Sequence, residues 1–493
     1  MLNSAAIPPK TRRHLSFDPL IRQIRLRAKQ LPETRNGNGC SYSVADAVMS
    51  AMALFALKDP SLLAFQERRN DANMKNIFRI GQVPSDTQMR EILDPLEPDA
   101  LRPMFNDVLR ALQRGKALEA FDFLDGYCLL SMDGSGYYSS KKVHCEHCLQ
   151  RTNSKTGEIT YHHQMLAAAL VHPDLKQVIP LAPEAIIKQD GDNKNDCERN
   201  ASKRLLQKIR DEHPHKKLIV VEDGLASNAP HIRLLKRLNM RFILGAKPDD
   251  HEHLFDEVSQ AEAAGRVTTL RWTEDTKQGG RQEEVTCEIR FAGQLPLNKS
   301  NTDLLVNFLQ YTEYASDGSI LKRFSWVTDL TITSANARHL VRGGRARWKI
   351  ENETFNTLKN QGYQFGHNFG HGEQHLSTIF AMLMMLAFLV DQTQELCCPL
   401  FQAVRKKRIT RRSLWDHQRS HFRHFEFTSM QQLHEVMLYD LAKELPVPTL
   451  AFRCARIPQC VSQVFVFVVF SGLESGEDIS ERVGFGLNGL VNF

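Results

Sequence analysis

The pattern of apolar and polar positions changes in character several times along the chain. Residues 1 to about 120 favour helices, and the stretch VADAVMSAMALFAL (44–57) has its apolar residues at helical spacing behind Ser43. Ser85, followed by Gln88 three residues later, is typical of a capped helix start. Because basic residues border these helices, we predict a helical N-terminal domain over residues 1–120 that binds DNA or only packs against the rest.

From about residue 121, β-rich apolar runs alternate with helical segments, a pattern that predicts an α/β sheet. The predicted strands cover 127–133, 160–171, 217–222 and 241–245, and the predicted helices cover 196–212 and 230–238.

Residues 250–332 hold several strand-like runs separated by Gly, Asn and Asp, which predicts an all-β insertion. Residues 334–360 then favour one helix, so 121–249 and 333–395 are expected to form one sheet domain. A basic, helical C-terminal region is expected over 396–493. Within it, VFVFVVF (464–470) is an aggregation-prone β segment to which the sequence assigns no function.

Bulk properties indicate a soluble intracellular protein. The net charge is +6, the first residues (MLNSAAIPPKTRRH) lack the apolar segment of a signal peptide, and ten cysteines are expected to stay reduced. The longest apolar run, Ile379 to Val390, is too short to cross a bilayer and predicts a buried helix, so no membrane partner is expected.

Three acidic residues occupy positions that favour metal-ion chemistry. Asp133 and Asp223 end predicted strands of one sheet, and Glu351 lies on the helix beyond the insertion. Acids at such strand ends converge in space, and three carboxylates can hold two Mg²⁺ or Mn²⁺ ions for in-line displacement at phosphorus. Each acid taken alone has the alternative of an ordinary loop residue.

In its order of elements and its motifs, LLSMDGSGYYSS, LIVVEDGLASNAPHI and RWKIENETFNTLK, the chain resembles the DDE transposases of insertion sequences. The resemblance covers about residues 40–400. It implies an α/β fold with a ribonuclease H-like mixed sheet and flanking helices, interrupted by the all-β insertion and bordered by helical N- and C-terminal parts. It also implies that Asp133, Asp223 and Glu351 are the catalytic metal ligands.

Part of one subfamily signature is retained. Arg347 and Glu351 match the spacing of its Arg and Glu, which lie one helical turn apart and favour either phosphate binding by Arg347 or a simple ion pair. The signature also has a Tyr three residues before the Arg and a Lys seven residues after the Glu. Gly344 stands at the position of the Tyr. The position of the Lys is Leu358, so the role of the Lys is assigned to Lys359, one residue later. In relatives that form hairpin ends, an aromatic residue at the place of Trp326 stacks on a flipped base, whereas the plainer interpretation is a core residue of the sheet.

Cysteine and histidine residues gather after Asp133. Cys145 and Cys148, with His162 or His163 and with Cys197, predict a structural zinc site, and the alternatives are buried thiols without metal or a redox pair. His367, His371 and His375 also recur every four residues, but the glycines between them favour a loop, and metal binding is not expected there.

The densest basic run should contact the DNA backbone; its first four members are Arg405, Lys406, Lys407 and Arg408. A solvated charged face is the alternative. A second basic cluster, with Lys203 and Lys208, precedes Asp223.

The resemblance implies an endonuclease and strand-transfer enzyme that binds inverted-repeat ends and target DNA. It would act as at least a dimer in the nucleoid-associated cytoplasm of a prokaryote. A metal-dependent nuclease of the same fold without strand transfer, or a non-catalytic DNA-binding regulator, are the alternatives.

Overall fold

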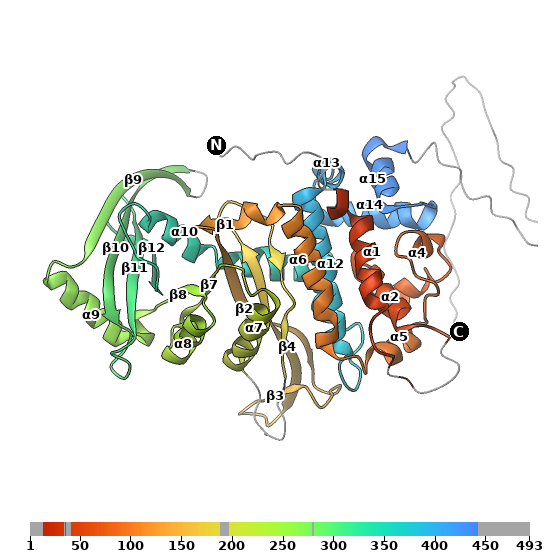
Figure 1. Ribbon diagram of the computed structural model, residues 1–493, viewed down its shortest axis with the longest axis horizontal. Coiled ribbons are helices and arrows are strands. Elements are labelled where there is room, and N and C mark those ends of the chain that lie inside the picture. The colour runs from red at the N-terminus through yellow and green to blue at the C-terminus, as the bar shows by residue number, and fades with distance from the viewer. Residues whose placement is uncertain (1–12, 34, 36–40, 188–196, 279–280, 442–493) are drawn as a thin grey trace, which may run out of the picture. The chain divides into compact units, whose positions relative to one another are not determined.

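The computed structural model describes residues 13–33, 35, 41–187, 197–278 and 281–441, and Figure 1 shows their arrangement. The predicted β segment at 464–470 therefore lies outside the described residues.

The first part of the chain is helical, as predicted. Its helices are α1 (Phe17–Ala28), α2 (Val44–Leu57), α3 (Leu62–Gln66), α4 (Ala72–Asn76), α5 (Asp86–Leu93) and α6 (Arg102–Arg114), with short 3₁₀ turns η2 (Pro98–Leu101) and η3 (Ala117–Phe121). Ser43 accepts a hydrogen bond from the amide of Asp46 at the start of α2, and Ser85 accepts one from the amide of Gln88 at the start of α5. Both predicted helix starts are confirmed.

The sheet that follows has the predicted mixture of antiparallel and parallel strands. Its first elements are β1 (Asp122–Leu124), β2 (Tyr127–Ser140), β3 (Leu149–Thr152), β4 (Ile159–Val171), β5 (Ile179–Pro180), β6 (Glu184–Ile186), α7 (Glu198–Glu212), β7 (Leu218–Glu222), η4 (Gly224–Ala226), α8 (Ala229–Arg237) and β8 (Arg241–Gly245). Central strand β2 runs antiparallel to β4 and parallel to β7, and β7 runs parallel to β8. The short strands β5 and β6 pair with the other side of β4. This order is that of the ribonuclease H-like sheet expected from the resemblance.

The segment 250–332 differs from the predicted all-β insertion because it begins with η5 (Pro248–Asp250) and helix α9 (Glu252–Ala263); Leu254, Val258 and Ala261 form the buried face of that helix. Its strands are β9 (Thr268–Gln278), β10 (Arg281–Pro296), β11 (Leu305–Tyr314) and β12 (Ile320–Thr328). Because β12 pairs with β8, the insertion extends the sheet to twelve strands in the described part of the chain (Figure 1).

The predicted single helix over 334–360 is divided into three pieces: α10 (Ala337–Arg345), the π-helical segment η6 (Ile350–Phe355) and α11 (Asn356–Asn360). Glu351 lies on η6. Single π-helical turns are frequent at functional sites, because the widened turn changes the direction of a side chain.

The C-terminal helices of the described part are α12 (Leu376–Cys397), α13 (Pro399–Lys407), α14 (Arg411–His424) and α15 (Met430–Tyr439). Helix α12 packs against α2 and α6 (Figure 1), which joins the two ends of the described chain in one helical core. By length and composition α12 is the one helix among the described residues that qualifies as a membrane span, but its apolar window is completely buried inside the protein. It is the core helix predicted from the run Ile379 to Val390.

A buried ion pair connects these helices. The Lys58 ammonium, at the end of α2, bonds to the carboxylate of Asp391 on α12 and lies 3.7 Å from the centre of the Trp415 ring. Tyr363 donates a second hydrogen bond to Asp391, at 2.5 Å. The charge of Lys58 is therefore balanced entirely inside the helical core.

Replacing Asp391 with Ala should destabilise the protein strongly, because it leaves the buried ammonium of Lys58 without its counter-charge. We expect a loss of about 3–5 kcal/mol in the free energy of unfolding, measured by denaturant titration. The matched control is Asp416→Ala, which removes an exposed ion pair with Arg419 on α14 and should cost at most about 1 kcal/mol. Equal losses in the two variants would contradict this assignment.

Candidate functional site

Asp133 lies within the central strand of the sheet. It sits opposite Ala167 of β4 and accepts a hydrogen bond from the amide of Gly134 at 2.9 Å. The strand was predicted to end at this residue, but β2 continues to Ser140 because pairing with β4 extends that far. Two residues earlier, the Ser131 hydroxyl donates to the carbonyl of Arg347 at 3.0 Å, which fastens the segment before Glu351 to β2.

Asp223 immediately follows the neighbouring parallel strand β7. Its carboxylate accepts a hydrogen bond from the amide of Leu225 at 3.0 Å, which fixes the turn at the end of the strand. The β2–β7 register pairs Ser131 with Val221, so Asp133 and Asp223 stand two residues further along adjacent strands. Both aspartates line one cavity of about 270 Å³.

Glu351 is connected to this pair through Arg347. The Arg347 guanidinium donates to the Glu351 carboxylate at 2.7 Å and lies 3.9 Å from a carboxylate oxygen of Asp133. The i,i+4 ion pair predicted as one alternative is therefore present. The same guanidinium also reaches toward Asp133 on β2, whereas Glu351 is not among the side chains that line the cavity.

The carboxylates perturb one another. Burial raises the pKa of Asp133 to about 6, and the negative charge of Glu351 adds to this effect while Arg347 opposes it. Burial also raises the pKa of Glu198, reinforced by the charges of Asp223 and Glu222. Burial is the main cause of both shifts, and the neighbouring negative charges add to it.

Glu198 is an acidic neighbour that the sequence did not reveal. It begins α7, lines the same cavity, and lies directly over the backbone of β2: a Cβ atom added at Gly134 would come within 2.1 Å of its carboxylate oxygen. Glycine inside a strand often marks such a close approach. That signal was present in the sequence, but nothing there named the partner.

Trp326 is a packing residue. Its side chain is only 6% exposed, and a Cβ atom added at Gly344 of α10 would lie 2.6 Å from the indole. The indole thus occupies the space that a larger side chain at position 344 would need.

The predicted DNA-binding side chains differ in their availability. Lys359, on α11, is exposed and lies 6.0 Å from the Phe355 ring. Lys406 is exposed at the end of α13, whereas Lys407 pairs with Asp440. Arg405 donates to the backbone carbonyl of Arg408 at 3.0 Å, so part of this basic run is held by the protein itself.

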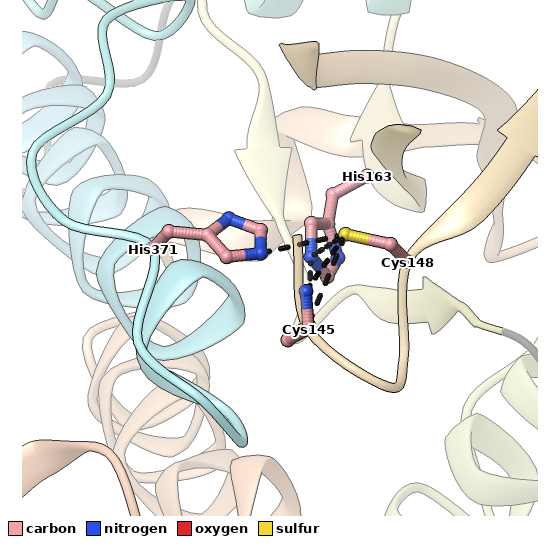
Figure 2. A group of neighbouring side chains, drawn as sticks. All are labelled: Cys145, Cys148, His163 and His371. Atoms are coloured by element: carbon pink, nitrogen blue, oxygen red, sulfur yellow. Dashed lines mark hydrogen bonds between the residues drawn. The ribbon is translucent and has the colours of Figure 1, made fainter. Parts of the chain in front are cut away.

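A second group of side chains has the composition of a metal site. Cys145, Cys148, His163 and His371 place one ligand atom each within 4.8 Å of one another. Figure 2 shows the four side chains together. Hydrogen bonding with Cys148 and the two imidazoles lowers the pKa of the Cys145 thiol against the effect of burial. Cys145 and Cys148 are not joined in a disulfide.

This group differs from the predicted ligand set. His163 and the two cysteines belong to it, but His162, the neighbour on β4, does not. Cys197 is exposed at the start of α7 and lines the aspartate cavity instead. The fourth position belongs to His371, for which metal binding was not expected. The expectation of a loop around His371 was right, but a loop can present a ligand as well as a helix can.

The sheet order is that of a ribonuclease H-like fold, and Asp133 and Asp223 line one cavity beside its central strands. A family model described as "Transposase DDE domain" matches residues 139–389, just over half of the chain, and the chain belongs to this family of DNA-cleaving and transposing enzymes. Asp223 and Glu351 lie inside the matched range, and Asp133 lies six residues before it. A search of the curated proteins finds no match to this chain.

The raised pKa of Asp133 makes a prediction for the metal-free protein. Relative to the ordinary value of 3.8, a folded-state pKa of about 6 favours the protonated form in the folded protein. Its stabilising contribution is complete below about pH 4 and is lost as the pH rises through about 6. Asp133→Asn should therefore melt at a higher temperature than wild type at pH 7 in chelator, with a smaller difference near pH 4.5.

Thermal melts between pH 4.5 and pH 7 measure the difference in melting temperature. Asp416→Asn, which changes an exposed carboxylate, serves as the control and should show no such difference. A wild-type protein at least as stable as Asp133→Asn at pH 7 would show that the acidic group carries no electrostatic strain.

Proposed function

We propose that this chain is the transposase of a prokaryotic mobile element. It cleaves the inverted-repeat ends and joins their 3′-OH groups to target DNA, with Asp133, Asp223 and Glu351 as its catalytic carboxylates. The observation that carries the proposal is the β2–β7 register. It brings two aspartates to one cavity, while Arg347 connects Asp133 to the glutamate.

The donor set fits Mg²⁺ or Mn²⁺. The proposed ligands are carboxylate oxygens, which hard divalent cations prefer. Burial raises the pKa of Asp133, and the charge of Glu351 adds to this effect. A bound pair of such ions supplies activation of the attacking oxygen and stabilisation of the leaving oxygen. Asp133 and Asp223 would hold them from the sheet and Glu351 from η6.

Arg347 supplies the complementary positive charge. Its guanidinium, which bonds to Glu351 in this structure, has the planar geometry that binds a phosphate through two parallel hydrogen bonds. With cations neutralising the acids, Arg347 would be released to hold a DNA phosphate beside them. Exposed Lys359 and Lys406 would add contacts to the backbone.

The same residues would serve hydrolysis and strand transfer, with water and then a DNA 3′-OH as the attacking group. Synapsis of two DNA ends requires at least a dimer, and the substrate places the enzyme at the nucleoid in the cytoplasm.

Removing one carboxylate should abolish chemistry without abolishing DNA binding. We expect Asp223→Ala and Glu351→Gln to reduce Mg²⁺-dependent cleavage of the element's own ends at least about a thousandfold. Binding of the same ends, followed by gel mobility shift, should remain. Glu353→Gln is the matched control, because this residue lies two positions further along η6 on a different face of the helix.

Strand transfer is tested separately with pre-cleaved ends and a target plasmid. Products with wild type but none with Glu351→Gln support a transposase; end cleavage without joining would identify a nuclease instead. Wild-type cleavage by Asp223→Ala would remove the proposed mechanism.

Gly134 offers a test of the role of Glu198. Gly134→Ala would push the Glu198 carboxylate away from β2, whereas the matched Gly136→Ala finds its nearest atom at 3.8 Å. Loss of a residue that supports a metal site typically costs about 10- to 100-fold in activity, and we expect a loss of that size in cleavage for Gly134→Ala alone. The two variants should have the same melting temperature. Unchanged cleavage by Gly134→Ala would show that Glu198 plays no part in the reaction.

A further inference from the structure

The four cysteine and histidine side chains come from three separate parts of the fold. Cys145 and Cys148 lie in the connection between β2 and β3, His163 lies on β4, and His371 lies in the connection between α11 and α12. Figure 2 shows the ligand atoms pointing toward one another. An ion bound to all four side chains would connect the sheet to the loop between α11 and α12, which follows the segment that carries Glu351.

Their spacing matches a single tetrahedral ion. With Zn–S near 2.3 Å and Zn–N near 2.0 Å, a tetrahedron places two sulfurs about 3.8 Å apart and sulfur and nitrogen about 3.5 Å apart. The Sγ atoms of Cys145 and Cys148 are 3.9 Å apart, and each lies 3.3–3.4 Å from Nε2 of His163. Nε2 of His371 lies 3.4 Å from Sγ of Cys148.

Other uses of these residues fit less well. The two thiols are free, so they form no disulfide. A two-iron cluster with two cysteines and two histidines binds each residue type to a different iron, which requires wider separation between sulfur and nitrogen than is found here. Two thiolates and two imidazoles around one point suit zinc.

The site is already assembled by other contacts. The Cys145 amide donates to Sγ of Cys148 at 3.5 Å, and the Tyr138 ring lies 4.3 Å from that of His371. Asp94, at the end of α5, accepts hydrogen bonds from the amides of Glu373, Gln374 and Leu376, which hold the loop in place.

The imidazoles also lack other polar roles. His163 and His371 are 2% and 6% exposed, and their Nδ1 atoms have no hydrogen-bond partner among the described residues.

We infer that Cys145, Cys148, His163 and His371 bind one structural zinc ion, which fastens the loop before α12 to the catalytic sheet. This site is distinct from the carboxylate group in both ligand type and residues, and it does not depend on the proposed function. Metal binding would deprotonate the two thiols, release those protons to solvent, and leave both imidazoles neutral with Nε2 on the ion.

The test measures metal content of the purified full chain by inductively coupled plasma mass spectrometry. We expect about one zinc ion per chain in wild type and loss of most of it in Cys148→Ser and His371→Ala. The matched controls are Cys197→Ser and His162→Ala, which replace the same residue types outside the group and should keep the zinc. Asp223→Ala should also keep it, which separates this site from the catalytic one.

A second measurement uses wild type alone, in case the ligand variants fail to fold. After zinc is removed by a chelator, added Co²⁺ should give the intense absorption of a tetrahedral site with a thiolate-to-cobalt band. Hydrogen exchange of the loop 366–375 should increase on chelation and be restored by Zn²⁺. A folded wild type without zinc that cannot bind Co²⁺, an iron cluster, or equal zinc loss in the Cys197 and His162 controls would each overturn the inference.

Discussion

The parallel pairing of β2 with β7 is the constraint on which the proposed catalytic centre depends. Two aspartates separated by 90 positions in the sequence line one cavity because β2 and β7 pair in parallel up to Ser131 and Val221, two residues before each aspartate. Side chains alternate between the two faces of a strand, so a slip of one residue would turn Asp133 away from the cavity. The buried residues of β7, all five of them, fix that register by packing on both faces of the sheet.

Electrostatics then set a second requirement. The strands and α7 bring Asp133, Asp223 and Glu198 together, and η6 adds Glu351 through Arg347. Burying like charges in this way costs folding free energy unless positive charge accompanies them. In this structure Arg347 provides it; with the proposed cations present, the same guanidinium would become available to DNA. Arg347 thus offsets part of the negative charge through Glu351 and Asp133.

Local sequence predicted the elements well where one face or the whole run is apolar. The helix 44–57 and the strands at 217–222 and 241–245 agree with the structure almost residue for residue, because periodicity and caps are local properties. The sequence was least informative where contacts between distant parts of the chain decide the structure. The insertion strands join the main sheet through β12, and Glu198 approaches Gly134 across the fold. His371 meets a cysteine 223 positions away, and no spacing rule within a short motif could have paired them.

Gly344 and Trp326 show how a contact between distant residues changes the interpretation of a motif. From the sequence of the helix alone, Gly344 is simply a position where the signature has a tyrosine and this chain does not. The structure shows that the space belongs to the indole of Trp326, which comes from the neighbouring strand β12 and is buried there. The two positions therefore form a single packing unit, and an aromatic ring is present at this place although the helix does not supply it. Because that ring supports α10 just before Arg347 and Glu351, its contribution is to hold the helix that leads into the acidic group.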